Sequence, residues 1–200
     1  GSSNLDLVVT AKRFPKPGET IFGKKFEMFP GGKGANQAVC AARLGCKTTF
    51  IGKMGNDEFH EKLSVILIEA GVDINNLFID EEEHTGTALI TVDESGQNQI
   101  IVISGSNMKL SPQDIIAKSD LFSNTAVVLT QLEIPIDTVV QSAKLTRQNN
   151  AIFILNPAPA ASLPENIFPL IDFITPNENE LELLSGVIIN DDSSIKLAAD

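Results

Sequence analysis

The sequence predicts an α/β protein in which helices flank both faces of a central, mostly parallel sheet, with a small antiparallel sheet added to it. Short apolar runs rich in Ile, Val and Phe alternate with helical patterns from residue 47 onward, and this alternation is typical of βα units. The apolar runs are continuous, as expected for strands that are covered on both faces. Two other stretches, 7–29 and 86–104, alternate with period two around turn residues, which favours hairpins outside the main sheet.

The expected strands and helices around the main sheet have clear ends. The strands are predicted at residues 48–51, 126–129, 151–155 and 171–174. Glycine ends the helices predicted at 35–44, 58–70 and 178–185, proline begins the one at 135–146, and Ser111 caps another that starts with Pro112. A last helix is expected to begin near residue 191.

The two predicted hairpins turn at residues 15–18 and 93–96, where Pro, Gly, Asp and Ser gather. Their Phe, Ile and Leu residues provide enough apolar surface for a small sheet that covers a site or pairs with a second subunit. Exposed strand edges of this kind need covering. The alternative is that both hairpins simply extend the main sheet.

The composition favours one main globular domain and argues against several classes of partner. Of the 200 residues 42% are hydrophobic, which is enough for a substantial core. A net charge of -11 argues against a sequence-independent grip on nucleic acid or on an anionic membrane. No apolar run approaches the roughly 18 residues of a membrane span. Cys40 and Cys46 fit neither a zinc site nor a disulfide framework, so reduced thiols in a cytoplasmic protein are expected.

The run Gly-Gly-Lys-Gly-Ala-Asn at residues 31–36 indicates a ligand site. Glycine lets the backbone approach a bound molecule closely, and a helix that begins here offers N–H groups and a partial positive charge. The run matches neither a P-loop nor a dinucleotide-binding fingerprint. The alternative is a glycine-rich turn that only joins a strand to a helix.

Amide and carboxylate side chains flank or follow several predicted strands, at the edge where open α/β sheets bind ligands. These residues are Asn4, Asp6, Glu133, Asn156, Asn177 and Glu180. Pairs of such groups can bind the vicinal hydroxyls of a polyol or sugar. Alternatively, Asp6 and Glu133 are solvated acids, and Asn156 and Asn177 cap turns beside proline. Glu180 could also hold magnesium through water.

Seven stretches of the chain, in this order, resemble the motifs of the ribokinase family of ATP-dependent sugar kinases. They lie at residues 1–6, 14–20, 31–38, 85–90, 131–133, 156–160 and 175–180. The resemblance runs over nearly the whole chain. It implies that residues 1–200 form an incomplete domain of the ribokinase-like α/β fold, with a lid formed by about 7–31 and 84–106.

The resemblance also implies roles for individual residues. The sugar hydroxyls would be bound by Asn4, Asp6, Gly31, Gly32, Lys33, Gly34, Asn36 and Glu133. Ala88 and Ile90 would cover the sugar as part of the lid, and the lid would also form the contact of a homodimer. Asn177 would lie near the nucleotide phosphates, and Glu180 would organise Mg2+ and the phosphates through water.

The reaction implied by the resemblance moves the γ-phosphoryl group of ATP to the 5-hydroxyl of D-ribose, with Mg2+ and a monovalent cation such as K+. The family's catalytic aspartate, adenine-binding loops and monovalent-cation site belong to its C-terminal third, whereas this sequence stops at Asp200. No catalytic base is therefore named, and the chain alone is expected to be inactive. The alternatives are another pentose, ketohexose or nucleoside kinase of the family, or a non-catalytic fragment that binds sugar or pairs with a subunit.

Overall fold

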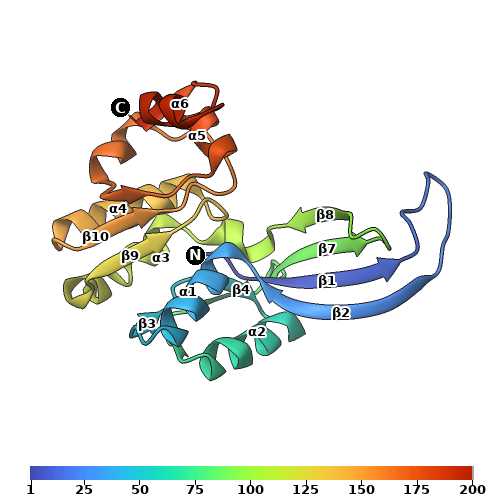
Figure 1. Cartoon of the computed structure of the whole chain (residues 1–200). Helices are drawn as coiled ribbons and strands as arrows, with labels where there is room; N and C mark the ends of the chain where they lie inside the picture. Colours follow the sequence, from blue (N-terminus) through green and yellow to red (C-terminus); the bar gives the residue numbers. More distant parts are fainter. Residues whose placement is uncertain (200) are drawn as a thin grey trace. The chain divides into compact units, whose positions relative to one another are not determined.

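The computed structural model describes residues 1–199 and divides into two compact units. The first unit comprises Ser2–Lys109, and the second comprises Gly1 together with the residues from Leu110 onward. Both units combine strands with helices, so the α/β class predicted from the sequence is confirmed (Figure 1). None of the described helices is long and apolar enough to cross a membrane.

A four-stranded sheet dominates the first unit, and we call it the lid sheet after its expected role. Its strands are β1 (Asn4–Ala11), β2 (Gly23–Gly31), β7 (Gly86–Val92) and β8 (Asn98–Ile103), in the order β2-β1-β7-β8. β1 and β2 form one antiparallel hairpin and β7 and β8 the other, as the period-two patterns predicted. Parallel pairing of β1 with β7 joins the two hairpins, and the sheet extends beyond the helices of its unit (Figure 1).

Two helices and two small parallel sheets complete most of the first unit. Helix α1 spans Lys33–Arg43 and α2 spans Glu58–Glu69, close to their predicted ranges. The small sheets pair β3 (Thr48–Thr49) with β5 (Val72–Asp73) and β4 (Lys53–Gly55) with β6 (Phe78–Asp80). A 3-10 helix, η1, follows the lid sheet at Gly105–Lys109. The strand predicted at 48–51 is shorter in the structure, because β3 pairs only with the two residues of β5.

The core of the first unit decides which face of β1 is polar. Leu5 and Leu7 pack with apolar residues of α1 and α2. Side chains alternate along a strand, so Asn4 and Asp6 point to the opposite face of the lid sheet. The two polar residues predicted at the start of the chain therefore stand on the face opposite the core.

The second unit contains a three-stranded parallel sheet in the order β11-β10-β9. Its elements in chain order are α3 (Pro112–Ile116), η2 (Ser119–Asn124), β9 (Val127–Thr130), α4 (Ile136–Gln148), β10 (Ile152–Leu155), η3 (Glu165–Leu170), β11 (Phe173–Ile174), α5 (Glu178–Ser185) and α6 (Asp192–Ala199). Val139 of α4 and Phe153 of β10 are fully buried in its core. The strand predicted at 171–174 is shorter in the structure, because the Asp172 carboxylate accepts the N–H of Phe153 (2.7 Å) in place of a backbone carbonyl.

Candidate functional site

The glycine-rich run lies where β2 ends beside β1 and α1 begins. Gly31 pairs with Asn4 in the sheet, and a Cβ added to Gly31 would collide with the carboxylate of Asp6. Gly32 has a φ of +83°, and a Cβ there would lie 2.6 Å from Ser3 Cα. Gly32 is therefore needed for the backbone before α1 to approach the first residues of β1, and Gly31 leaves room for the Asp6 side chain. This close approach brings the glycine-rich run and the polar start of β1 to one place.

The first turn of α1 is capped by the chain that precedes β1. The Gly34 N–H donates to Ser2 Oγ (3.1 Å), and the Ala35 N–H donates to Ser2 O (2.8 Å). The expectation that these N–H groups are open to a ligand is wrong, because Ser2 occupies them. The run instead offers a ligand its glycine backbone and two side chains, of which Lys33 is half-buried and Asn36 is exposed.

The predicted sugar contacts of the lid sheet share one face. In the β1–β7 register, Asn4 lies beside Gly86 and Asp6 lies beside Ala88. Paired residues of neighbouring strands point to the same side of a sheet, so the side chains of Asn4, Asp6 and Ala88 lie on one face. Ile90, two residues further along β7, lies on it as well. The structure thus places two polar and two apolar predicted contacts together, with Asn4 only 5% exposed.

A buried amide that sequence reasoning missed holds Asn4 in place. Asn107 of η1 is 2% exposed. Its Oδ1 accepts from Ser3 N (2.9 Å), and its Nδ2 donates to Ser3 O (3.1 Å) and to Asn4 Oδ1 (2.8 Å). A Cβ added to Gly86 would collide with both amides. The available signal was a polar side chain shortly after an apolar strand, the same pattern that pointed to the other amides.

A second network that the sequence did not reveal ties α2 to β7. Asp57 caps α2 by accepting from the N–H groups of Phe59 (3.0 Å) and His60 (2.9 Å). It also accepts from Thr85 N (2.7 Å) and Thr85 Oγ1 (2.8 Å). Partial burial opposes the charge of Asp57, but these hydrogen bonds outweigh it, so the pKa of this carboxyl lies below its ordinary value. Thr85 directly precedes β7, and the ionised carboxylate therefore fixes the base of the lid sheet.

Three of the predicted contacts in the second unit make hydrogen bonds within that unit. Asn177 and Glu180 form a capping box at the start of α5. The Glu180 N–H donates to Asn177 Oδ1 (2.8 Å), and Glu180 Oε2 and Oε1 accept from Asn177 N (2.9 Å) and Nδ2 (3.0 Å). Asn156 Nδ2 donates to Thr175 O (3.1 Å), while Glu133 is half-buried after β9. The capping alternative for Asn177 is confirmed, and a ligand role for these residues stays a prediction. No group of three or more His, Cys, Asp or Glu side chains within residues 1–199 is placed to hold a metal ion.

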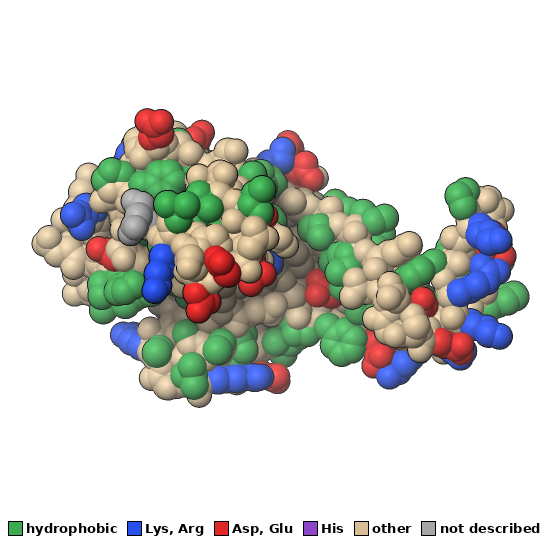
Figure 2. Space-filling view, turned by 45° about the horizontal axis from the view of Figure 1, so that its top comes forward, with side chains coloured by type: hydrophobic (Ala, Val, Ile, Leu, Met, Phe, Trp, Pro, Cys, Tyr) green, Lys and Arg blue, Asp and Glu red, His purple; other side chains and the backbone are tan. Residues whose placement is uncertain are grey.

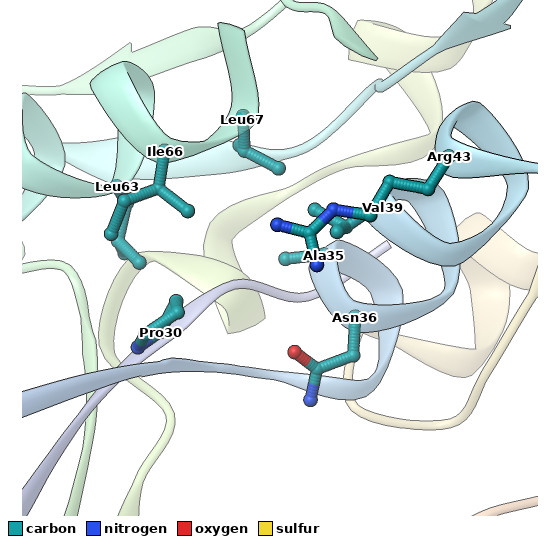
Figure 3. A pocket seen from close by; sticks show the side chains of 8 residues that line it. All are labelled: Pro30, Ala35, Asn36, Val39, Arg43, Leu63, Ile66 and Leu67. Atoms are coloured by element: carbon teal, nitrogen blue, oxygen red, sulfur yellow. The ribbon is translucent and has the colours of Figure 1, made fainter. Parts of the chain in front are cut away.

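An apolar pocket of about 190 Å³ lies between α1 and α2 (Figure 3). Its lining residues are Pro30, Ala35, Asn36, Val39, Arg43, Leu63, Ile66 and Leu67. Pro30 pairs with Leu5 and therefore belongs to the apolar face of the lid sheet, opposite to Asp6. This mostly apolar lining is unsuited to a polyol, although Asn36 was predicted as a sugar contact. The apolar lining argues against this pocket as the place where a sugar binds.

Comparisons with known proteins show which class of protein this fold belongs to. The model of the pfkB family of carbohydrate kinases matches residues 1–200. The chain belongs to this family.

Several relatives are ribokinases. A ribokinase of Staphylococcus aureus (strain COL) is 40% identical over 98% of this chain and 65% of the relative. A bifunctional ribokinase/ribose-5-phosphate isomerase A of Fructilactobacillus sanfranciscensis is 42% identical over 98% of this chain and 36% of that protein. The structure of Arabidopsis thaliana ribokinase complexed with ribose and ATP is 35% identical, with a TM-score of 0.90 over 100% of this chain and 65% of that one. The chain therefore has the ribokinase-like fold, and it spans about two thirds or less of the length of these relatives.

Proposed function

We propose that the complete protein is an ATP-dependent kinase that transfers the γ-phosphoryl group to the 5-hydroxyl of D-ribose, and that this chain carries the sugar site and the lid. The observation that carries the proposal is the common face of Asn4, Asp6, Ala88 and Ile90 on the lid sheet. Support also comes from the Arabidopsis thaliana ribokinase, whose structure is a complex with ribose and ATP and matches the whole of this chain.

Asn4 and Asp6 supply complementary groups for a sugar. An ionised carboxylate only accepts hydrogen bonds, whereas an amide has one end that donates and one that accepts. A sugar hydroxyl can do both, so adjacent hydroxyls can satisfy the two side chains together. The absence of a side chain at Gly31 leaves room for the Asp6 carboxylate. The sugar site would be completed by Gly32, Lys33, Gly34, Asn36 and Glu133.

The lid sheet would keep water away from the reacting groups. Phosphoryl transfer to a sugar competes with hydrolysis of ATP, so a kinase benefits from a closed site. Ala88 and Ile90 place apolar side chains on the same face as Asp6. We therefore assign the lid to about 7–31 and 84–106, a pair of segments that contains β2, β7, β8 and most of β1.

Asn177 and Glu180 would lie near the phosphates of ATP, with Glu180 holding Mg2+ through water. Each Glu180 carboxylate oxygen accepts one hydrogen bond from Asn177. A carboxylate offers about four lone-pair sites, so it can also accept from a water of the magnesium shell, which Mg2+ usually keeps in part. Bound Mg2+ would neutralise charge on the phosphates. A monovalent cation such as K+ belongs to the proposal on the family resemblance alone.

We also propose a cytoplasmic homodimer that pairs through the lid sheet. Its exposed large apolar side chains are Phe26, Met28, Phe29, Leu89, Ile100, Ile101, Val102 and Ile103. Figure 2 shows apolar side chains in green along the lid, with Lys and Arg in blue at its far end. β2 and β8 are the edge strands of the sheet, and apolar edge strands favour pairing with a further chain. A second copy would remove this apolar surface from water.

A second candidate substrate is deoxyribose. Deoxyribokinases of Salmonella typhi and Salmonella typhimurium are 35% identical over 100% of this chain. Ketohexoses and nucleosides are further acceptors within the same family. The ratio of kcat/KM for D-ribose to kcat/KM for 2-deoxy-D-ribose separates the two leading candidates.

The test is an ATP-dependent phosphorylation assay of the complete protein with D-ribose, 2-deoxy-D-ribose, D-fructose and adenosine. We expect the highest kcat/KM for D-ribose. Asp6→Asn should lower that kcat/KM by about 30-fold to 1000-fold, because a half-buried carboxylate acceptor is replaced by a group that also donates. The matched control is Asp73→Asn on β5, away from the lid sheet, which should change kcat/KM by less than about twofold. A higher kcat/KM for another acceptor would overturn the assignment of ribose, and sugar binding without any turnover would favour the non-catalytic alternative.

A further inference from the structure

We propose that Asn107 is a positioning residue that makes the Asn4 amide a hydrogen-bond donor toward the sugar, and so selects for a hydroxyl at one ring position. This inference rests on the proposed function, in which Asn4 contacts the sugar. The observation that carries it is the chain of hydrogen bonds from the Ser3 backbone through Asn107 to Asn4.

Asn107 is held firmly at the base of the lid sheet. It belongs to η1, and its own N–H donates to Ser104 O (3.1 Å). The neighbouring Ser106 is fully buried, with its N–H bonded to His84 O (2.9 Å) and its Oγ bonded to Lys53 O (3.0 Å). The Asn107 side chain is therefore presented to β1 by a segment with its own fixed contacts.

The backbone of Ser3 determines the positions of the oxygen and the nitrogen of the Asn107 side-chain amide. A backbone N–H can only donate and a backbone C=O can only accept. Ser3 N therefore requires the oxygen of the Asn107 amide, at 2.9 Å, and Ser3 O requires its NH2 group, at 3.1 Å. With the amide reversed, its NH2 group would face the N–H of Ser3 and its oxygen would face the C=O of Ser3. Two backbone atoms thus fix the orientation without reference to any ligand.

Asn107 in turn decides the orientation of Asn4. The second proton of Asn107 Nδ2 points to Asn4, at 2.8 Å from Asn4 Oδ1. A donor at that place requires the oxygen of the Asn4 amide, so the NH2 group of Asn4 is turned the other way. Gly86 leaves room for this bond, because a Cβ there would collide with both amides. The Asn4 side chain therefore offers a ligand its donor end.

The consequence is that two side chains of β1 have fixed roles as hydrogen-bond donor and acceptor. Asn4 presents a donor and Asp6, two residues further on the same face, presents an acceptor when ionised. A sugar hydroxyl opposite Asn4 must accept, and a hydroxyl opposite Asp6 must donate. A ring carbon without a hydroxyl opposite Asn4 would leave a nearly buried donor unpaired, which is strongly disfavoured.

The test uses Asn107→Asp in the complete protein. The introduced carboxylate keeps an oxygen for Ser3 N but replaces the NH2 group by a second acceptor. Asn4 must then turn its own NH2 group toward residue 107, which leaves its oxygen facing the sugar. Calorimetry at pH 8 measures the dissociation constants of D-ribose and of each monodeoxy analogue of D-ribose.

We expect the wild-type protein to bind one monodeoxy analogue at least about tenfold more weakly than ribose because of Asn4. Asn107→Asp should weaken ribose binding by about tenfold to a hundredfold. It should change the affinity for that analogue by less than about twofold, so the preference for ribose over the analogue should disappear. Asn4→Asp retains an oxygen for Asn107 Nδ2 and also faces the sugar with an oxygen, so it should lose the same discrimination. A merely structural role of Asn107 would weaken all sugars alike.

The matched control is Ser106→Ala, which removes a half-buried hydrogen bond from the same 3-10 helix without touching Asn4. It should lower the melting temperature and retain the discrimination. Retained discrimination in Asn107→Asp would overturn the inference while leaving the kinase proposal intact. If Asn107→Asp does not fold, the Asn4→Asp variant provides the test: a retained preference for ribose over the analogue in that variant would also overturn the inference. A wild-type protein that binds no pentose would instead overturn the proposed function.

Discussion

Alanine at Gly32 should destabilise the protein more than alanine at an equally left-handed glycine in open space. Gly32 has a φ of +83°, and a Cβ there would lie 2.6 Å from Ser3 Cα and 2.8 Å from Asn4 N. These are backbone atoms, so no side-chain rotation relieves the clash. The left-handed conformation costs an alanine about 1–2 kcal/mol, and a methyl group forced into a packed site costs about 1–3 kcal/mol more. We therefore expect the free energy of unfolding to fall by about 2–5 kcal/mol.

The matched control for this variant is Gly96→Ala. Gly96 also has a φ of +83°, but a Cβ there would meet nothing within 4 Å, so only the conformational cost of about 1–2 kcal/mol applies. Urea denaturation of both variants of the complete protein measures the difference, and calorimetry with D-ribose follows the site. Ribose affinity should fall with Gly32→Ala, because the clash displaces Asn4, and should be unchanged with Gly96→Ala. Equal losses of stability would refute the close packing of the glycine-rich run on β1.

Two further predictions concern Asp57 and the helix caps. Asp57→Asn should lower the free energy of unfolding at pH 7 by about 1–3 kcal/mol, because the bonds from Thr85 lose their charged acceptor. Folding lowers the pKa of Asp57. This stabilisation is therefore present above the pKa of about 3.9 in the unfolded chain, and it is lost as the pH falls through the pKa in the folded protein. Urea melts at pH 2 that still show the full difference in unfolding free energy between wild type and variant would contradict this. Asn177→Ala and Ser111→Ala each remove a capping box and should each lower stability by about 1 kcal/mol. Only Asn177→Ala should also raise the KM for ATP, and an unchanged KM would remove Asn177 from the phosphate site.

Features that neighbouring residues decide could be predicted from the sequence. α5 spans Glu178–Ser185 as predicted, because Gly186 ends it and Asn177 caps it. The lid hairpins were equally visible, since their alternating patterns and turns lie close together in the chain. The residue types at Asn4 and Asp6 likewise suggested hydroxyl recognition before any contact was known.

Contacts between distant segments could not be predicted in this way. The parallel pairing of β1 with β7, the capping of α1 by Ser2 and the orientation of Asn4 by Asn107 all depend on backbone groups that meet only in the folded chain. No residue type identifies such a partner beforehand, because any N–H or C=O in the right place would serve. The short strands β3 and β11 fall in the same category, since the extent of pairing decides their length. The sequence therefore indicated which residues form the polar face, but not which of their atoms point outward.

Strand β1 is a single piece that runs from two residues of the proposed sugar site to the far hairpin turn. Asn4 and Asp6 lie in its first half, and both neighbouring strands are bonded along its length. A rotation of the sheet as a body about Ser3 would therefore carry Asp6 with it. At about 3.3 Å per residue, a swing of roughly 10° would move Asp6 by somewhat under about 2 Å, which is enough to break a hydrogen bond. In the proposed function, sugar affinity would therefore depend on the angle of the sheet.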